Sequence, residues 1–383
     1  MKTKLVKYTS ILLLSLIGSI MQTQAQMPHT YPPGITLAHS FADVEPAGIT
    51  LSENGRLFMC LPRGGVNHKH PSVVEIIDGK AVAFPNKAIN QNVDTDLPHH
   101  LVSVLGITLY KNTLWILDQG KRAGIDGIPD GSTKIVAVDI NTKEVIKNIP
   151  IPRPFFRETI QLNDLRFDPT HGKEGTIYIS NNGFAKPDQS IIVADVATGK
   201  LRELFRDAPE VSPVKGFMTY VEGFPHTLSY EKPTMPQGGV NGIELSPDFK
   251  TLYWTIPTNP NFYSIPTEII SDAHLSESDI KKAIKWEGQI VSNGGITIDE
   301  EGTLYFGDAS RYSILKKDTA GNVSLAAYDP RLIWPDGMIY WKGNLYVTIG
   351  QWHRAPGLND GKDLRHGPYE VLKIPITEKA KNQ

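Results

Sequence analysis

The feature that most constrains the fold is a pattern of two short strands and a polar turn that occurs six times along the chain. Each copy alternates apolar and polar residues, turns at Gly, Asp, Asn or Lys, and ends in aromatic or β-branched residues. The copies are GITLSENGRLFMC from Gly48, GITLYKNTLWILD from Gly106, DLRFDPTHGKEGTIYIS from Asp164, GIELSPDFKTLYWT from Gly242, GITIDEEGTLYFG from Gly295 and GMIYWKGNLYVT from Gly337. Their starts lie between 42 residues (Gly295 to Gly337) and 78 residues (Asp164 to Gly242) apart, about one four-stranded propeller blade.

Further strand-like segments follow the first five copies, whereas the sixth is followed only by YEVLKIPI before the chain ends. The segment ITLAHSF, Ile35 to Phe41, precedes the first copy and would supply the missing outer strand. We therefore predict an all-β fold, a six-bladed β-propeller closed by pairing of the N-terminal strand with the last blade, which removes exposed sheet edges. A two-domain β-sandwich arrangement is the alternative and explains the repeat less well. One helix is expected, in SESDIKKAIK from Ser276, as an insertion in the fourth blade.

The N-terminus has the pattern of a secretory signal. Lys2, Lys4 and Lys7 precede the apolar run Ile11 to Met21, and Thr23-Gln24-Ala25 resembles a cleavage site. We expect a signal peptide at 1–25, a tail at 26–34, a single propeller at 35–377 and a second tail at 378–383. The protein is then exported, periplasmic or extracellular, and we expect a monomer.

Charge and cysteine content exclude several classes of partner. Losing the three N-terminal lysines changes the formal net charge from −2 to −5, so a nucleic-acid-binding face is not expected. No segment beyond the signal is apolar for long enough to cross a membrane. The single cysteine, Cys60, excludes an internal disulfide and is interpreted as a core residue.

Oxygen-bearing side chains precede the first strand of several blades. Asn163, Asn241 and Asp336 stand immediately before the aligned starts, and Glu45 and Asn293 stand close to theirs. Because the first strand of a propeller blade is innermost, these side chains would converge on the mouth of the central channel. Such a ring could hold Ca²⁺ or a polar ligand, or the residues could simply cap turns.

The sequence also resembles the major royal jelly protein/yellow family, which includes proteins related to L-dopachrome tautomerase. The resemblance lies in NGRLFMCLPRGG, LVSVLGITLYKNTLWILDQG, LNDLRFD, IYISNNG, GIELSPDFKTLYW, FYSIPTEII and IWPDGMIYWKGNLYVT, in that order. A more distant resemblance is to the regucalcin/gluconolactonase propellers. Their pattern of Glu, two Asn and Asp is similar to Glu45, Asn163, Asn241 and Asp336, although Asp336 lies one blade later than that pattern requires.

Three functions follow from these resemblances. The first is a dopachrome-type tautomerase or isomerase, with His99, His100, Asp336 and His353 as candidate proton carriers. The second is a Ca²⁺-dependent lactonase with Glu45, Asn163, Asn241 and Asp336 as metal ligands. The third is a non-catalytic protein that binds amine-like ligands in the central cavity. The candidate ligand-binding residues are Arg63, Asn163, Asn241, Asn293, Trp352 and Arg354.

Overall fold

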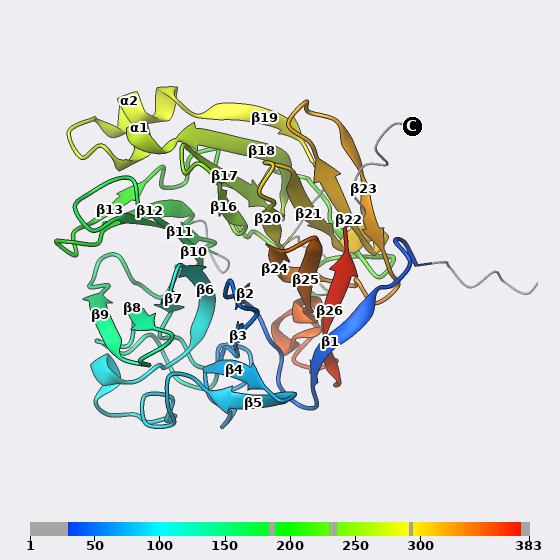
Figure 1. Ribbon diagram of the computed structural model, residues 1–383. Coiled ribbons are helices and arrows are strands. Elements are labelled where there is room, and N and C mark those ends of the chain that lie inside the picture. Colours follow the sequence, from blue (N-terminus) through cyan, green and yellow to red (C-terminus); the bar gives the residue numbers. More distant parts are fainter. Residues whose placement is uncertain (1–29, 184–187, 230, 232–235, 291–293, 377–383) are drawn as a thin grey trace, which may run out of the picture.

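Six antiparallel four-stranded sheets are arranged around one axis, which confirms the predicted six-bladed propeller (Figure 1). The computed structural model describes residues 30–183, 188–229, 231, 236–290 and 294–376. The predicted signal peptide (1–25) and C-terminal tail (378–383) lie outside the described residues. No helix in the described part of the chain is long and apolar enough to cross a membrane.

Each blade begins at the axis and ends at the periphery. Blades one to three comprise β2 (Ile49–Leu51), β3 (Leu57–Cys60), β4 (Val73–Ile77) and β5 (Lys80–Ala83); β6 (Val104–Tyr110), β7 (Thr113–Asp118), β8 (Lys134–Asp139) and β9 (Val145–Pro150); and β10 (Leu162–Asp168), β11 (Thr176–Asn181), β12 (Ser190–Asp195) and β13 (Leu201–Leu204). Blades four and five comprise β16 (Ile243–Leu245), β17 (Thr251–Ile256), β18 (Asn259–Pro266) and β19 (Lys285–Gln289); and β20 (Ile296–Ile298), β21 (Leu304–Asp308), β22 (Ser313–Lys317) and β23 (Val323–Tyr328).

The sixth blade joins the two ends of the chain. It consists of β24 (Pro335–Trp341), β25 (Asn344–Ile349), β26 (Tyr369–Pro375) and, outermost, β1 (Thr36–Phe41). β1 pairs antiparallel with β26, with Phe41 opposite Tyr369 and Thr36 opposite Lys373. The predicted closure of the ring is therefore confirmed.

Hydrophobic clusters lie between neighbouring blades. Tyr178 of β11 and Trp254 of β17, both fully buried, belong to the cluster between blades three and four. Cys60 is fully buried between blades one and two, where its thiol donates to the carbonyl of Leu105 at 3.0 Å. Cys60 is thus a core residue, as interpreted from the sequence.

The glycines that open the innermost strands are explained by close approach of the blades at the axis. A Cβ atom added to Gly295 would lie 1.8 Å from the carbonyl oxygen of Asp336, in the next blade. At Gly337 it would lie 2.2 Å from the carbonyl oxygen of Ala47. Only glycine permits this backbone contact, which accounts for the recurring Gly in the sequence pattern.

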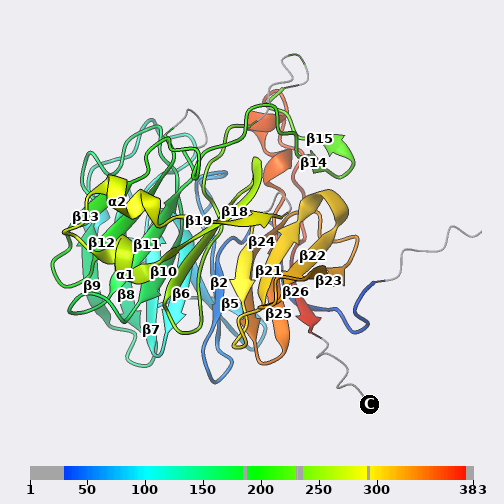
Figure 2. The same ribbon diagram turned by 90° about the horizontal axis from the view of Figure 1, so that it is seen from above.

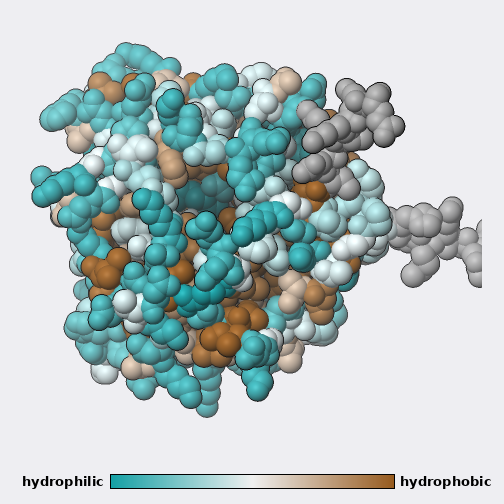
Figure 3. Space-filling model, viewed as in Figure 1, coloured by the Kyte–Doolittle hydropathy of each residue, from teal (hydrophilic) through white to brown (hydrophobic). Residues whose placement is uncertain are grey.

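The two faces of the propeller, at the two ends of its central channel, differ. One carries the tight turns between the first and second strands of each blade, and the surface on that side is mainly hydrophilic (Figure 3). The other carries long connections, the 3₁₀ turns η3 (Trp352–Arg354) and η4 (Pro356–Leu358), and the hairpin of β14 (Tyr220–Val221) and β15 (Phe224–Pro225) (Figure 2). Two short helices, α1 (Thr267–Ser271) and α2 (Glu277–Lys282), connect β18 to β19, and α2 begins after Ser276 as predicted.

Candidate ligand-binding site

A cavity of about 310 Å³ opens where the central channel meets the end with the long connections. We call it the mouth cavity. Its volume is within the usual range of small-molecule sites. The polar groups in its wall are mostly neutral amides, which come from blades two, three and four: Gln119, Gln161, Asn163, Asn182 and Asn241.

Two indoles form an aromatic wall of the mouth cavity. Trp334 and Trp352 both line it and both lie close to Gly350, where an added Cβ would come within 2.8 Å of Trp352 and 3.1 Å of Trp334. The Trp334 ring also contacts His226, with ring centroids 5.6 Å apart, and is stacked on His353 at 5.7 Å. Burial lowers the pKa of His226 to about 4, so its imidazole is neutral at pH 7.

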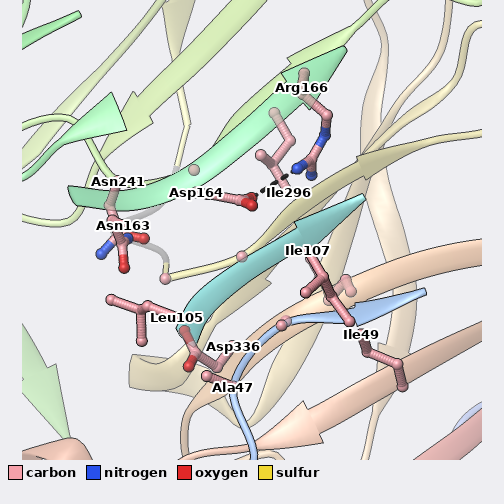
Figure 4. A pocket seen from close by; sticks show the side chains of 16 residues that line it. Ala47, Ile49, Leu105, Ile107, Asn163, Asp164, Arg166, Asn241, Ile296 and Asp336 are labelled. Atoms are coloured by element: carbon pink, nitrogen blue, oxygen red, sulfur yellow. Dashed lines mark hydrogen bonds and ion pairs between the residues drawn. The ribbon is translucent and has the colours of Figure 1, made fainter. Parts of the chain in front are cut away.

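A narrow channel of about 40 Å³ continues below the mouth cavity along the axis. Asn163, Asn241, Leu105 and Asp336 line both spaces and lie toward the same end of the channel in Figure 4. Toward the other end, Arg166 donates to Asp164 and to Glu244, at 2.8 Å in each case. One guanidinium thus binds two carboxylates, so this cluster keeps a net negative charge deep in the channel.

Asp336 is the acid that the sequence pattern placed correctly at the channel mouth. The indole N–H of Trp352 donates to its Oδ2 at 2.8 Å, and no cation among the described residues pairs with it. Burial raises the pKa of Asp336 to about 6, and the charge of Asp164 adds to that effect. The carboxyl is therefore mostly ionised at pH 7.5 but exchanges its proton close to neutrality.

Glu45 lies beside the cavity rather than in its wall. Its Oε1 accepts the backbone N–H of Gln351, and its Oε2 is 3.5 Å from the guanidinium of Arg365. Burial raises the pKa of Glu45 to about 7, although the Gln351 N–H and the Arg365 cation oppose the shift. The carboxyl group of Glu45 thus binds Gln351 and Arg365 and does not face the mouth cavity.

The expected calcium ligands therefore do not form a complete set. Ca²⁺ takes six to eight oxygens, typically with several carboxylates. Asp336, Asn163 and Asn241 line the same cavity, but Glu45 does not. Within residues 30–376, apart from the undescribed segments, no group of three or more His, Cys, Asp or Glu side chains is arranged to hold a metal ion.

Arg63, expected to contact a ligand, has a different role in the structure. Its side chain is fully buried, and its guanidinium donates to the carbonyls of Leu101, Val102, His70 and Asn90 at 2.8–3.0 Å. These bonds fix the connections of blades one and two. Arg63 therefore supports the wall of the site without lining the mouth cavity.

His99 and His100 are also remote from the mouth cavity. His99, in the 3₁₀ turn η1 (Leu97–His99), is exposed and contacts Asp96 at 2.5 Å. His100 contacts the carbonyl of Ala88 at 3.0 Å. Neither residue lines the cavity, so their predicted role in proton transfer finds no geometric support. Asn293 lies outside the described residues.

His353 and Arg354 are held by a carboxylate that the sequence analysis did not single out. Glu222, in the turn between β14 and β15, contacts His353 Nε2 at 2.6 Å and accepts from Arg354 at 2.5 and 2.9 Å. These three residues line a second cavity of about 350 Å³, which shares His226 and Leu358 with the mouth cavity. Arg354 is therefore already paired, and His353 reaches the mouth cavity only through Trp334.

Comparison with known protein families shows to which family this chain belongs. The model of the family described as "Major royal jelly protein" matches residues 102–355. The chain belongs to the major royal jelly protein family. A comparison with curated proteins finds no match.

Solved structures similar to this family member share its fold. A luciferin-regenerating enzyme has a TM-score of 0.53 at 12% identity, covering 89% of this chain and 94% of the other. Regucalcin from Agrobacterium tumefaciens, a calcium-binding protein, has a TM-score of 0.51 at 15% identity and the same coverage. A protein whose assignment as a gluconolactonase is provisional has a TM-score of 0.52 at 12% identity, covering 91% and 94%. At these identities the similarity concerns the propeller alone.

Several cavity residues of this royal jelly family propeller were missed by sequence reasoning. Gln119 and Asn182 directly follow β7 and β11, and their place at the ends of second strands could have identified them. Lys121 and His226 lie in long connections without periodicity. Nothing in the sequence pattern distinguishes them from other loop residues.

Proposed function

We propose that the protein binds a small aromatic molecule that carries an amine, and that the mouth cavity is the binding site. The observation that carries this proposal is the arrangement of Asp336, which has no cationic partner among the described residues, beside the indoles of Trp334 and Trp352. A carboxylate and two aromatic faces together suit a protonated amine on an aromatic ring.

The remaining wall of the cavity supports the same ligand class. The amides of Gln119, Gln161, Asn163, Asn182 and Asn241 can donate to or accept from hydroxyl or carbonyl substituents. Their neutrality leaves the Asp336 carboxylate as the dominant negative charge at the cavity. A few fixed polar groups on a mainly apolar wall are typical of small-molecule sites.

Calorimetric titration of the mature protein with aromatic amines and the corresponding amino acids tests the proposal. We expect at least one compound to bind with a 1:1 stoichiometry, and Asp336→Asn to weaken binding by about tenfold or more. Asp126→Asn, which changes an exposed carboxyl in the long connection of blade two, is the matched control and should bind normally. Absence of binding across the panel would overturn the proposal.

Tautomerisation of a catechol-derived quinone is the second candidate function. It is favoured by the carboxyl of Asp336, which exchanges its proton near neutral pH inside the same cavity. Turnover of an aminochrome, followed by absorbance, would distinguish this function from binding alone. We expect Asp336→Asn to abolish any such turnover while Asp126→Asn leaves it unchanged.

A Ca²⁺-dependent lactonase has less support. Glu45, the expected second carboxylate ligand, is engaged by Gln351 and Arg365. We therefore expect the melting temperature to be the same in EDTA and in added Ca²⁺. A higher melting temperature in Ca²⁺ would instead support a metal site formed by Glu45, Asn163, Asn241 and Asp336.

We also propose that the mature chain is exported. The basic and apolar pattern of residues 1–25 supports this proposal. N-terminal sequencing of the protein recovered from outside the cytoplasm would test it, with cleavage expected after Ala25.

A further inference from the structure

One lysine at the mouth cavity is not committed to any partner. Lys121, two residues after Gln119 in the long connection of blade two, lines the cavity. Among the described residues it has no ion-pair or hydrogen-bond partner. Three arginines in the long connections of blades two and six are paired instead: Arg122 with Asp94 at 2.7 Å, Arg354 with Glu222, and Arg365 with Asp363 at 2.8 Å.

Lys121 is also the only cation in the described wall of the mouth cavity, and Asp336 is its only carboxyl. The two charges come from different blades, and neither is neutralised by the other or by a described neighbour. A cavity with one unpaired cation and one unpaired anion is complementary to a ligand that carries both charges.

Two glycines, Gly64 and Gly65, also line the mouth cavity. Gly64 lies against Gln119 and the backbone of Lys121, at 3.4 and 3.7 Å from the position of an added Cβ. A Cβ added to its neighbour Gly65 would lie 2.7 Å from the guanidinium of Arg365, which pairs with Asp363 and Glu45, and 3.4 Å from the ring of Trp352. The lysine side of the cavity and the indole side are thus joined by two residues without side chains.

We propose that the ligand is an aromatic amino acid or a close derivative, with its ammonium group at Asp336, its carboxylate at Lys121 and its ring against Trp334 and Trp352. This inference rests on the proposed function and narrows it. An amine without a carboxylate leaves Lys121 unpaired, so it forgoes one charge-assisted contact. A carboxylate without an amine leaves Asp336 unpaired in the same way.

Pairs of compounds that differ only in the carboxylate provide the test. Calorimetry would compare tyrosine with tyramine and tryptophan with tryptamine, on the wild-type chain and on Lys121→Gln. We expect each amino acid to bind about tenfold more tightly than its amine, and this preference to disappear in Lys121→Gln. Lys121→Arg should retain the preference.

Lys69→Gln is the matched control, because Lys69 is exposed in the long connection of blade one on the same end of the propeller. It should leave the preference unchanged. Equal binding of amino acid and amine by the wild type, or a preference that survives in Lys121→Gln, would overturn this inference while leaving the proposed function intact. Failure of all four compounds to bind would overturn this inference, and failure of the whole panel of aromatic amines and amino acids would overturn the proposed function as well.

Discussion

The buried carboxyl of Asp336 affects the pH dependence of stability. In the unfolded chain an aspartate ionises near pH 4, whereas burial raises the pKa of Asp336 to about 6 in the folded protein. A raised carboxyl pKa means that the folded state holds the proton more tightly, so stability is lost as the pH rises through this interval. At neutral pH the ionised group destabilises the fold.

We therefore expect Asp336→Asn to raise the free energy of unfolding at pH 7.5 by on the order of 1–3 kcal/mol. The asparagine can still accept the indole N–H of Trp352. At pH 4, where the folded carboxyl is already protonated, the gain should largely vanish. Urea unfolding at the two pH values measures the difference, with Asp126→Asn as the control. An equal gain at both pH values would contradict the assignment of the shift to Asp336.

The axial glycines give a second prediction for single residues. Gly337→Ala would place a Cβ 2.2 Å from the carbonyl oxygen of Ala47 in the adjacent blade, so backbone must move. We expect a loss of about 3 kcal/mol or more, or failure to fold. Gly357→Ala is the control, because its added Cβ meets nothing within 4 Å. Thermal unfolding of both variants makes the comparison, and equal melting temperatures would refute the explanation.

Between β13 and β16 the chain makes a long crossing, and Glu222 in its hairpin binds the connection that follows β25 in the sixth blade. That carboxylate contacts His353 and Arg354 from the turn between β14 and β15. The crossing also contributes His226 to the mouth cavity. Loss of the Glu222 contacts should therefore make the hairpin of β14 and β15 more mobile, next to His226 in the wall of the mouth cavity.

For Glu222→Gln we expect faster hydrogen exchange over residues 209–229, by about tenfold, with a smaller change elsewhere. The Arg354 and His353 pairs lower the pKa of Glu222 despite its burial, so the attachment persists at neutral pH and weakens only below its ordinary range near 4.5. Glu231→Gln, in the same crossing and exposed, is the control. Unchanged exchange in Glu222→Gln would show that other contacts hold the hairpin.

The elements of this propeller differ in how far the sequence predicts them. Each inner strand pair repeats because the same local requirements recur, a glycine at the axis, a tight turn and a buried second strand. Asn163, Asn241 and Asp336 were located for that reason. Arg63, by contrast, does not line the mouth cavity, because its guanidinium is buried among carbonyls of connections far away in the sequence, which the local pattern does not reveal. Lys121 and His226 lie in segments whose course is set by tertiary contacts alone.

At the scale of the whole molecule, the ring is closed by the pairing of β1 with β26, near the two ends of the chain. Phe41 of β1 is buried in the cluster between blades six and one, together with Tyr369 and Val371 of β26. Leu37, on the same strand, is 49% exposed. Substitutions at these two positions of β1 therefore distinguish the effect of packing between blades six and one from the effect of any change in β1.

We expect Phe41→Ala to lower the free energy of unfolding by about 3 kcal/mol, because it leaves a cavity at the joint. Leu37→Ala should change it by less than about 1 kcal/mol. Equilibrium unfolding in urea, with size-exclusion chromatography to detect association through an opened sheet edge, makes the measurement. Similar effects of the two substitutions would argue that β1 is not required for closure.

The order of strands in the sixth blade also has a consequence for biosynthesis. Its outer strand, β1, leaves the ribosome before any other described strand, and its partner β26 leaves last. Trp334, Asp336 and Trp352 are synthesised only shortly before β26. β1 therefore has no partner strand until β26 has been synthesised, and the ring can close only after that point. A molecule that binds in the mouth cavity would therefore stabilise the closed ring and none of the earlier folding intermediates.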